Sequence, residues 1–172
     1  VLNVARYDPF KLAEAVLDGQ QARAQRMLDG LQAEGEAAVL VHWALADDIR
    51  SLYHVKRALA AGKPLPMALR EQRVWGPKEK RFERVLPRLS GPQLAQWLQD
   101  AHMVDGIVKG LKYPGWPVEP WQALHRLALG VCRACGRSTG QPEYFSPLTT
   151  ASYTQPPATE PKAKLVCALL LE

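Results

Sequence analysis

Cysteine and long apolar runs are both scarce in this sequence. Three cysteines among 172 residues cannot build the disulfide framework of a small secreted protein, so a reducing, cytoplasmic setting is expected. No run of about eighteen apolar residues occurs, which predicts that no segment spans a membrane. The chain starts Val-Leu-Asn-Val, without the basic stretch and apolar core of a secretory signal, and the missing initial Met suggests a piece of a longer protein.

Motifs that would indicate catalysis or nucleotide binding are also missing. Neither G-x-x-x-x-G-K-[ST] nor G-x-G-x-x-G occurs in the sequence. The four histidines form no His-x-x-x-His pair, and no nucleophile stands in a sharp, glycine-flanked turn; they are His42, His54, His102 and His125. We therefore expect no catalytic residues and no cofactor, with a triad assembled from distant residues as the open alternative.

The stretch Cys132-Arg133-Ala134-Cys135 has the spacing of half a zinc site. Zinc needs four ligands, and only His125 and the distant Cys167 could complete the set. Both cysteines fall near the end of an amphipathic segment, where cysteine behaves as a small hydrophobe. The pattern favours a structural role in the core and no bound metal.

Helical spacing of apolar residues recurs through the first 136 residues. Asp8-Pro9 predicts a helix start and Ser90-Gly91-Pro92-Gln93 a capping box. No segment alternates apolar and polar residues as a strand would. We predict an all-α fold, a compact bundle of about six to seven helices with a flexible C-terminal tail. The expected helical segments are one from Pro9 that stops at Gly19, one through Ala24 and Leu31 that ends at Gly35, Val41 to Leu59, Pro66 to Arg73, Lys78 to Arg88, Leu94 to Leu111, and Trp121 to Cys135.

Five tryptophans are many for this length. Trp43, Trp97 and Trp121 fall in helical apolar stripes and are predicted to lie in the core. Trp75 and Trp116 stand in turns beside Gly and Pro. For these two, burial in the monomer and a role as interface anchors are both open.

The long third segment carries more apolar residues than one stripe needs. Val39 and Leu40 widen its apolar surface, which predicts burial on more than one side there. Phe10, Ala13 and Leu17 fall on one face of the first helix. Asp47 and Asp48 are neighbours on the third segment and would face different sides, so they are predicted to be solvated and not to form a paired-acid site.

The composition changes after Gly136. Residues 137–164 are rich in Ser, Thr, Pro, Gln and Lys and lack an apolar stripe, which predicts a flexible tail. The last residues, 165–172, are apolar, so they are expected to pack on the bundle or on a neighbour. The predicted division is a helical domain over 1–136 and a Pro/Thr-rich tail of low order over 137–172.

Basic residues cluster between positions 50 and 88. The net charge of +5 and the pI of about 9.2 permit contact with an acidic partner or nucleic acid without requiring it. For any single residue a solvated helix face is favoured, and a stand-alone basic nucleic-acid-binding module is the alternative function. The cluster consists of Arg50, Lys56, Arg57, Lys63, Arg70, Arg73, Lys78, Lys80, Arg81, Arg84 and Arg88.

Asp105 and Lys109 lie four residues apart on a predicted helix. The acid comes first, which is the favourable order for an ion pair on a helix. Because Asp105 also borders the apolar stripe, we predict a structural ion pair between the two.

Several short stretches follow one another with a characteristic order and spacing. They are Tyr7-Asp8-Pro9-Phe10, Leu12 to Gly19, Ala24 to Leu28 with Leu31 and Glu34-Gly35-Glu36, Leu45 to Leu52, Arg73-Val74-Trp75, Ala101 to Asp105, and Val108-Lys109-Gly110. Together, over residues 4–135, they resemble the C-terminal region of the delta-subunit family of the bacterial DNA polymerase III clamp loader. The segment from about 137 has no counterpart in that family.

The resemblance implies a helical collar domain that packs beside the collars of other clamp-loader subunits in a ring. It also implies that the fragment itself is not catalytic, that the sliding clamp is contacted only through parts not found in this sequence, and that DNA is bound indirectly or weakly. Aromatic and basic residues crowd together near the start of the fifth segment. We predict a partner surface made of Arg73, Trp75, Arg81 and Arg84.

Overall fold

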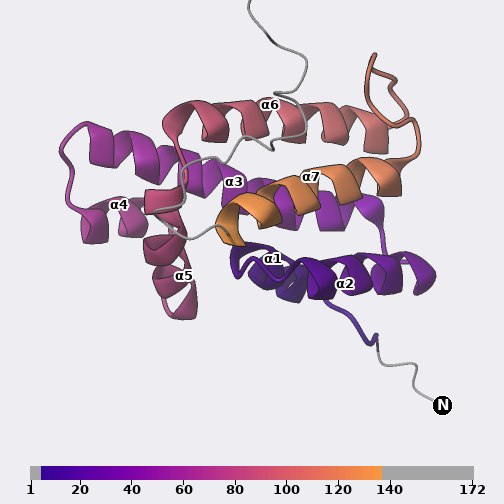
Figure 1. Cartoon of the computed structure of the whole chain (residues 1–172), viewed down its shortest axis with the longest axis horizontal. Coiled ribbons are helices and arrows are strands. Elements are labelled where there is room, and N and C mark those ends of the chain that lie inside the picture. Colours follow the sequence, from indigo (N-terminus) through magenta and orange to yellow (C-terminus); the bar gives the residue numbers. More distant parts are fainter. Residues whose placement is uncertain (1–4, 137–172) are drawn as a thin grey trace, which may run out of the picture. The chain divides into compact units, whose positions relative to one another are not determined.

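The computed structural model describes residues 5–136 of the chain. This part consists of seven α-helices and one short 3₁₀ helix, η1, and contains no strand (Figure 1). The predicted all-α bundle of about six to seven helices is confirmed, whereas the predicted tail over 137–172 lies outside the described residues. The elements are α1 (Pro9–Leu17), α2 (Gln21–Ala33), α3 (Ala38–Ala60), α4 (Leu65–Glu71), α5 (Pro77–Val85), η1 (Leu86–Arg88), α6 (Gly91–Val108) and α7 (Pro120–Gly136).

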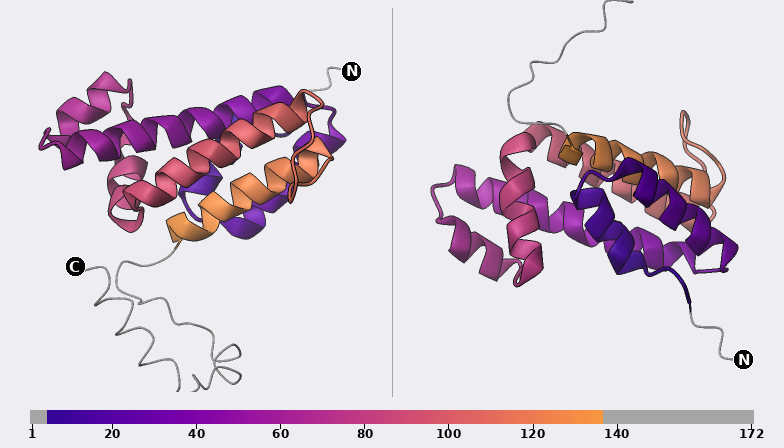
Figure 2. Two further views of the ribbon diagram at one scale, coloured as in Figure 1. Left: turned by 90° about the horizontal axis from the view of Figure 1, so that it is seen from above. Right: turned by 60° about the horizontal axis from the view of Figure 1, so that its bottom comes forward.

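The helix α3 is the element around which the bundle is built. It has 23 residues and packs against α1, α4, α6 and α7 (Figure 1). The helix α7 packs in turn against α1, α2 and α6, while α4 and α5 lie at one end of the bundle (Figure 2). Because α1 contacts both α3 and α5, these three helices border a common surface. Among the described helices, none combines the length and apolar content that a membrane crossing requires.

Local signals in the sequence set the helix ends. Asp8 Oδ1 accepts a hydrogen bond of 2.9 Å from the backbone N–H of Phe10, and Ser90 Oγ accepts one of 3.2 Å from Gln93. Each bond satisfies an N–H group that the first turn of a helix leaves unpaired, so both predicted N-caps are confirmed. Gly35 ends α2 with a φ of 75°, a conformation in which a side chain would be strained.

The predicted stripe of α3 forms the centre of the core. Val41, Leu45, Ile49, Leu52 and Val55 are all at most 4% exposed. Burying each such side chain contributes about 1.5–3 kcal/mol before the loss of conformational entropy is counted. The stripe therefore fixes the side of α3 that faces α6 and α7. Whether the other side of the helix is buried depends on the shorter elements that pack there.

The opposite side of α3 is more open than the sequence predicted. Trp43 is 50% exposed, so its predicted place in the core is wrong, and Phe10 is 52% exposed. Val39 and Leu40, expected to be buried on a second side of α3, are 50% and 39% exposed. The reason is that α1 has only nine residues. Within residues 5–136 it leaves the first turns of α3 uncovered on this side.

Two predicted helices end three residues earlier than expected. The segment from Lys78 to Arg88 divides into α5 and η1, because Pro87 lacks an N–H group and cannot continue an α-helix. The helix predicted to reach Leu111 ends at Val108, and the following Gly110 adopts a φ of 95°. Leu111 is consequently exposed and does not extend the apolar stripe of α6.

Candidate functional site

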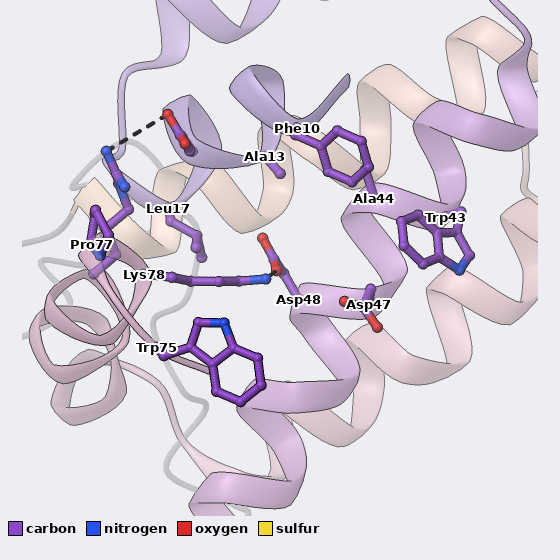
Figure 3. Close-up of a pocket in the computed structure, with 12 residues that line it drawn as sticks. Phe10, Ala13, Leu17, Trp43, Ala44, Asp47, Asp48, Trp75, Pro77 and Lys78 are labelled. Carbon is purple, nitrogen blue, oxygen red and sulfur yellow. Dashed lines mark ion pairs between the residues drawn. The ribbon is translucent and has the colours of Figure 1, made fainter. Parts of the chain in front are cut away.

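The most distinctive surface is a groove bordered by α1, α3, α5 and the connection before α5. We call it the aromatic groove; its volume is about 240 Å³ (Figure 3). It is lined by Phe10, Ala13, Glu14, Leu17, Trp43, Ala44, Asp47, Asp48, Trp75, Pro77, Lys78 and Arg81. The groove thus combines apolar walls with charged groups of both signs.

Three aromatic side chains stand at the edges of this groove. Trp75 is 64% exposed, and Phe10 and Trp43 are about half exposed. The rings of Phe10 and Trp43 meet edge to face with their centroids 5.9 Å apart, which holds both rings in place. Large aromatic rings exposed around a groove are typical of protein-binding hot spots.

The floor of the groove contains a buried charge pair. Asp48 is 7% exposed, and the ammonium of Lys78 lies 2.5 Å from its Oδ1 atom (Figure 3). Burial raises the pKa of the Asp48 carboxyl above its ordinary value, although Lys78 acts in the opposite direction. The prediction that Asp47 and Asp48 are both solvated is therefore wrong for Asp48. The pair ties α5 to α3 and positions Trp75, which lies two residues before α5.

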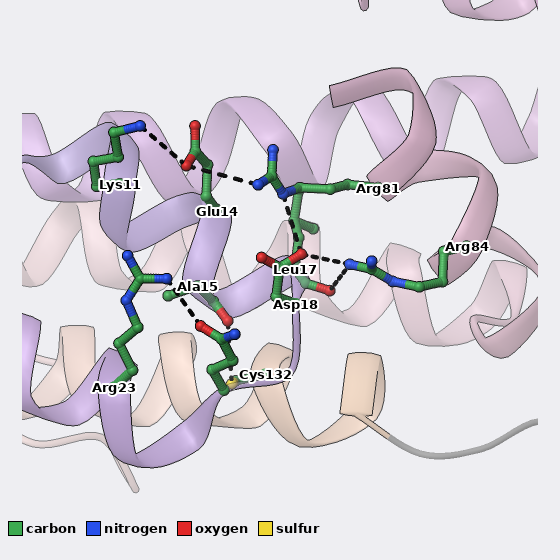
Figure 4. A network of polar contacts seen from close by, with 10 residues as sticks. Lys11, Glu14, Ala15, Leu17, Asp18, Arg23, Arg81, Arg84 and Cys132 are labelled. Atoms are coloured by element: carbon green, nitrogen blue, oxygen red, sulfur yellow. Dashed lines mark hydrogen bonds and ion pairs between the residues drawn. The ribbon is translucent and has the colours of Figure 1, made fainter. Parts of the chain in front are cut away.

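A second set of ion pairs ties α5 to α1. Asp18, just after α1, accepts from Arg81 Nε at 3.1 Å and also pairs with Arg84 (Figure 4). Arg81 further approaches Glu14 at 3.8 Å, and Arg84 donates to the backbone oxygen of Leu17 at 3.5 Å. Acidic side chains in α1 and just after it therefore hold these two arginines in place.

The four residues of the predicted partner surface do not occupy equivalent places. Trp75 and Arg81 both line the aromatic groove, and Arg84 lies beside it through the shared contact with Asp18. Arg73 is exposed but is not among the groove residues, and its φ of 56° marks the turn after α4. The structure thus brings Trp75 and Arg81 together and leaves Arg73 apart.

The sequence reading missed Phe10, Trp43 and Asp48 as members of this site. One signal was available for Trp43, because it shares its helical face with Asp47 and Arg50, which lie four and seven residues further on. Those two side chains form an exposed ion pair of 3.6 Å. A face that carries charged residues one and two turns away is more open than a face lined by Val and Leu.

Asp105 connects α6 to α3 as well as to its own helix. Lys109 Nζ lies 2.8 Å from Asp105 Oδ2, a hydrogen bond that lowers the pKa of the carboxyl. On the other side, His42 Nδ1 lies 3.8 Å from Asp105 Oδ1, while His42 Nε2 donates to the backbone oxygen of Ala101 at 2.8 Å. Through His42, which is 9% exposed, the acid reaches the α3–α6 interface.

Cys132 and Cys135 lie on the inner face of α7. Both are buried free thiols, and burial raises the pKa of Cys135 to about 12. At neutral pH that thiol stays protonated and is a poor nucleophile. Across residues 5–136, no three His, Cys, Asp or Glu side chains gather as a metal site would require.

Many members of the basic cluster bind acceptors within the chain. Besides Lys78, Arg81 and Arg84, Lys63 pairs with Glu71 at 2.7 Å, and Arg88 donates to the backbone oxygen of Cys135 at 2.6 Å. Such contacts withdraw donors that a phosphate backbone would otherwise engage. The cluster is therefore less available than its sequence density indicates.

Comparison with known proteins shows which family this chain is similar to. The family described as "Processivity clamp loader gamma complex DNA pol III C-term" matches residues 9–136. DNA polymerase III subunit delta from Escherichia coli (strain K12) is 32% identical over 132 residues, which is 77% of this chain and 37% of that relative. The chain thus spans well under half the length of this curated relative.

Proposed function

Because the chain belongs to the family of C-terminal domains of the DNA polymerase III clamp-loader delta subunit, as its resemblance predicted, we propose that it is a non-catalytic assembly domain. In this role it is a collar that packs beside the collars of neighbouring clamp-loader subunits. The resulting ring places the sliding clamp on DNA during replication. Contacts to the clamp are assigned to parts of the protein outside this sequence, and the setting is the bacterial cytoplasm.

The aromatic groove is the single observation that carries the proposal. A domain that acts alone gains nothing from leaving Trp75, Trp43 and Phe10 half or more exposed around one groove, since burying such rings is favourable. A neighbouring collar that covered them would recover this free energy on assembly. We therefore propose the aromatic groove as a subunit interface, with Trp75 as its leading anchor.

The remaining predicted residues take supporting roles in this proposal. Arg81 and Arg84, bound to Asp18, hold α5 against α1 and so keep Trp75 at the groove edge. Asp105 and Lys109 serve as a structural pair at the end of α6. Arg73 is left as an exposed neighbour of the interface whose contact is made only in the complex.

Assembly is tested by mixing the full chain with the other clamp-loader subunits and measuring complex formation by sizing and by titration. We expect the wild-type chain to enter the complex. Trp43→Ala with Trp75→Ala should lower the affinity by about 30-fold or more, since removing hot-spot aromatics typically costs about 2 kcal/mol or more. Met67→Ala is the matched control, because Met67 is 51% exposed on α4 and does not line the groove.

The alternative, a stand-alone nucleic-acid-binding module, makes a different prediction. It requires tight DNA binding by the chain alone, with an affinity that falls steeply as salt rises. If that result is obtained and the wild-type chain joins none of the other subunits, the assembly role is contradicted. If the tryptophan variants join them as well as the wild type does, the aromatic groove is not the subunit interface.

A further inference from the structure

A second groove runs between α6 and α7 on a part of the bundle that the aromatic groove does not use. We call it the α7 groove; its volume is about 340 Å³. Trp116, in the connection between the two helices, is one of its lining residues. Its lining includes Trp97, Asp100, Trp116, Arg126, Gly130 and Arg133. The two grooves have no lining residue in common.

The α7 side of this groove is cationic. The helix from Pro120 to Gly136 contains no Asp or Glu, and both Arg126 and Arg133 are exposed. The guanidinium of Arg126 lies 4.0 Å from the centre of the Trp116 ring and donates to the backbone oxygen of Gly115 at 2.6 Å. It is therefore held in place before any partner arrives, which lowers the entropy lost on binding.

Among residues 5–136, carboxylates compensate little of this charge. Asp100, across the groove on α6, already accepts a hydrogen bond of 3.0 Å from Gln96. His125 also lines the groove, and its Nε2 atom lies 3.2 Å from Asp29 on α2. The two guanidiniums of α7 thus face the groove with a single carboxylate opposite them.

Gly130 is the unusual residue of the groove. It lies in the interior of α7, where glycine is less favourable than alanine. Two other glycines inside helices have a reason within the chain: a Cβ on Gly30 would lie 2.1 Å from the Tyr7 ring, and one on Gly106 would lie 2.4 Å from the Tyr113 hydroxyl. Apart from its chain neighbours and the backbone of its own helix, a Cβ on Gly130 would meet no atom of residues 5–136 within 4 Å. The fold of the described bundle therefore gives no reason for glycine here.

Spacing along the helix puts the glycine between the two charges. Arg126, Gly130 and Arg133 occupy positions i, i+4 and i+7, which lie on one face of α7. A glycine at such a place forms a notch into which another backbone can approach closely. Two guanidiniums beside a notch suit a helix that brings its own backbone near Gly130 and carboxylates toward both arginines.

We propose that the α7 groove binds an acidic helix of a neighbouring clamp-loader subunit, with Gly130 as the point of closest approach. This inference rests on the proposed function, because a member of a ring meets its two neighbours through different surfaces. The aromatic groove serves one neighbour and the α7 groove the other. The two guanidiniums favour a partner with acidic side chains. The notch at Gly130 favours a helix over an extended chain.

A protein partner fits this groove better than a nucleic acid. Two guanidiniums are few for a phosphate backbone, which usually engages a longer stripe of basic side chains. The groove also has apolar walls from Trp97, Trp116 and Leu129. A helix with apolar and acidic side chains satisfies both kinds of wall.

The decisive variant is Gly130→Ala, because the inference predicts opposite changes in stability and in binding. The alanine meets open space within residues 5–136 and favours the helix, so Tm of the free full-length chain should rise by about 2–5 °C. In the complex the added methyl fills the notch, so the affinity for the other clamp-loader subunits should fall about tenfold. If this glycine mattered only for folding, its replacement would not raise stability while lowering the affinity.

Arg133→Gln tests the charge, with an expected loss of about fivefold in affinity and a weaker salt dependence. Gln122→Ala, on an exposed part of α7 outside the groove, and Arg26→Gln, on α2, are the matched controls. All variants are titrated against the same set of purified clamp-loader subunits.

The outcomes separate this inference from the proposed function. If the wild-type chain joins no clamp-loader subunit, the proposed function fails and this inference fails with it. If the wild type binds, and Gly130→Ala and Arg133→Gln bind equally well, only the α7 groove assignment is overturned. The assignment is also overturned if both variants lose affinity for duplex DNA and keep their affinity for the subunits.

Discussion

The two grooves differ in how their charges are balanced. In the aromatic groove, Asp48 is neutralised by Lys78 from another helix, and the Arg81 guanidinium is shared between Glu14 and Asp18. In the α7 groove, Arg133 is exposed on a helix that has no acidic residue. Charges of the first groove join elements that are distant in the sequence, whereas on α7 Arg126 donates to the nearby backbone oxygen of Gly115 and Arg133 is exposed.

This difference separates charges that stabilise the fold from charges that are available for binding a partner. A charge pair that joins α3 to α5 is formed when the chain folds, so its removal should weaken the fold. A guanidinium exposed to water contributes little to folding, because water solvates it as well in the unfolded chain. Exposed aromatic rings remain the binding element of the first groove, and exposed cations are the binding element of the second.

The largest expected effect comes from removing the cation on the floor of the aromatic groove. Lys78→Met should lower the free energy of unfolding by about 2 kcal/mol, since it leaves the Asp48 carboxylate buried without its partner. The loss is smaller than the ~3–5 kcal/mol of a fully buried pair, because the Lys78 side chain is 38% exposed. Urea unfolding at neutral pH measures it.

Lys80→Met is the control for this variant, because Lys80 is exposed on the same helix. It should change the free energy of unfolding by no more than about 0.5 kcal/mol. Equal losses for Lys78→Met and Lys80→Met would show that the Asp48 pair is not coupled to folding, and the contrast between the grooves would disappear.

A smaller effect is expected in the pH dependence of stability. The pKa of Asp48 is raised in the folded chain, so the contribution of this group to stability is full below its ordinary value of 3.8 and is lost as pH rises through the folded value. Asp48→Asn removes this titration. The stability of Asp48→Asn relative to the wild type should therefore increase as pH rises above about 3.8.

Asp105 provides an internal control of opposite sign. Its pKa is lowered by the Lys109 hydrogen bond, so its contribution is present above 3.8 and is lost as pH falls through the folded value. The stability of Asp105→Asn relative to the wild type should therefore decrease as pH rises toward 3.8 and level off above that value, where the stability of Asp48→Asn relative to the wild type increases. Thermal unfolding at a series of pH values distinguishes the two, and curves that run in the same direction would refute the assignment for Asp48.

The helices could be predicted from sequence because their signals are local. Caps such as Asp8 and Ser90 act within three residues, and the stripe of α3 repeats every three or four. The exposure of Trp43 could not be predicted in the same way. Whether an apolar residue outside the main stripe is covered depends on the length of α1, an element far away in sequence.

The candidate sites were predicted less completely for the same reason. Trp75 could be identified as a possible anchor because it stands in a turn beside Gly and Pro. The Asp48–Lys78 pair joins two helices with no pattern linking them along the chain. Gly130 carries no sequence signal that sets it apart from Gly106, and only the space around each position distinguishes them.

The smallest expected effect on folding is that of removing the Arg133 charge, and it tests the difference between the two grooves most directly. Arg133→Gln should change the free energy of unfolding by no more than about 0.5 kcal/mol, because the side chain is exposed and its charge is solvated in both states. Urea unfolding at low and at high salt should give the same small difference. A loss comparable to that of Lys78→Met would mean that Arg133 is bound to an acceptor of its own chain. The α7 groove would then resemble the aromatic groove, with its charge already used in folding and unavailable to a neighbour.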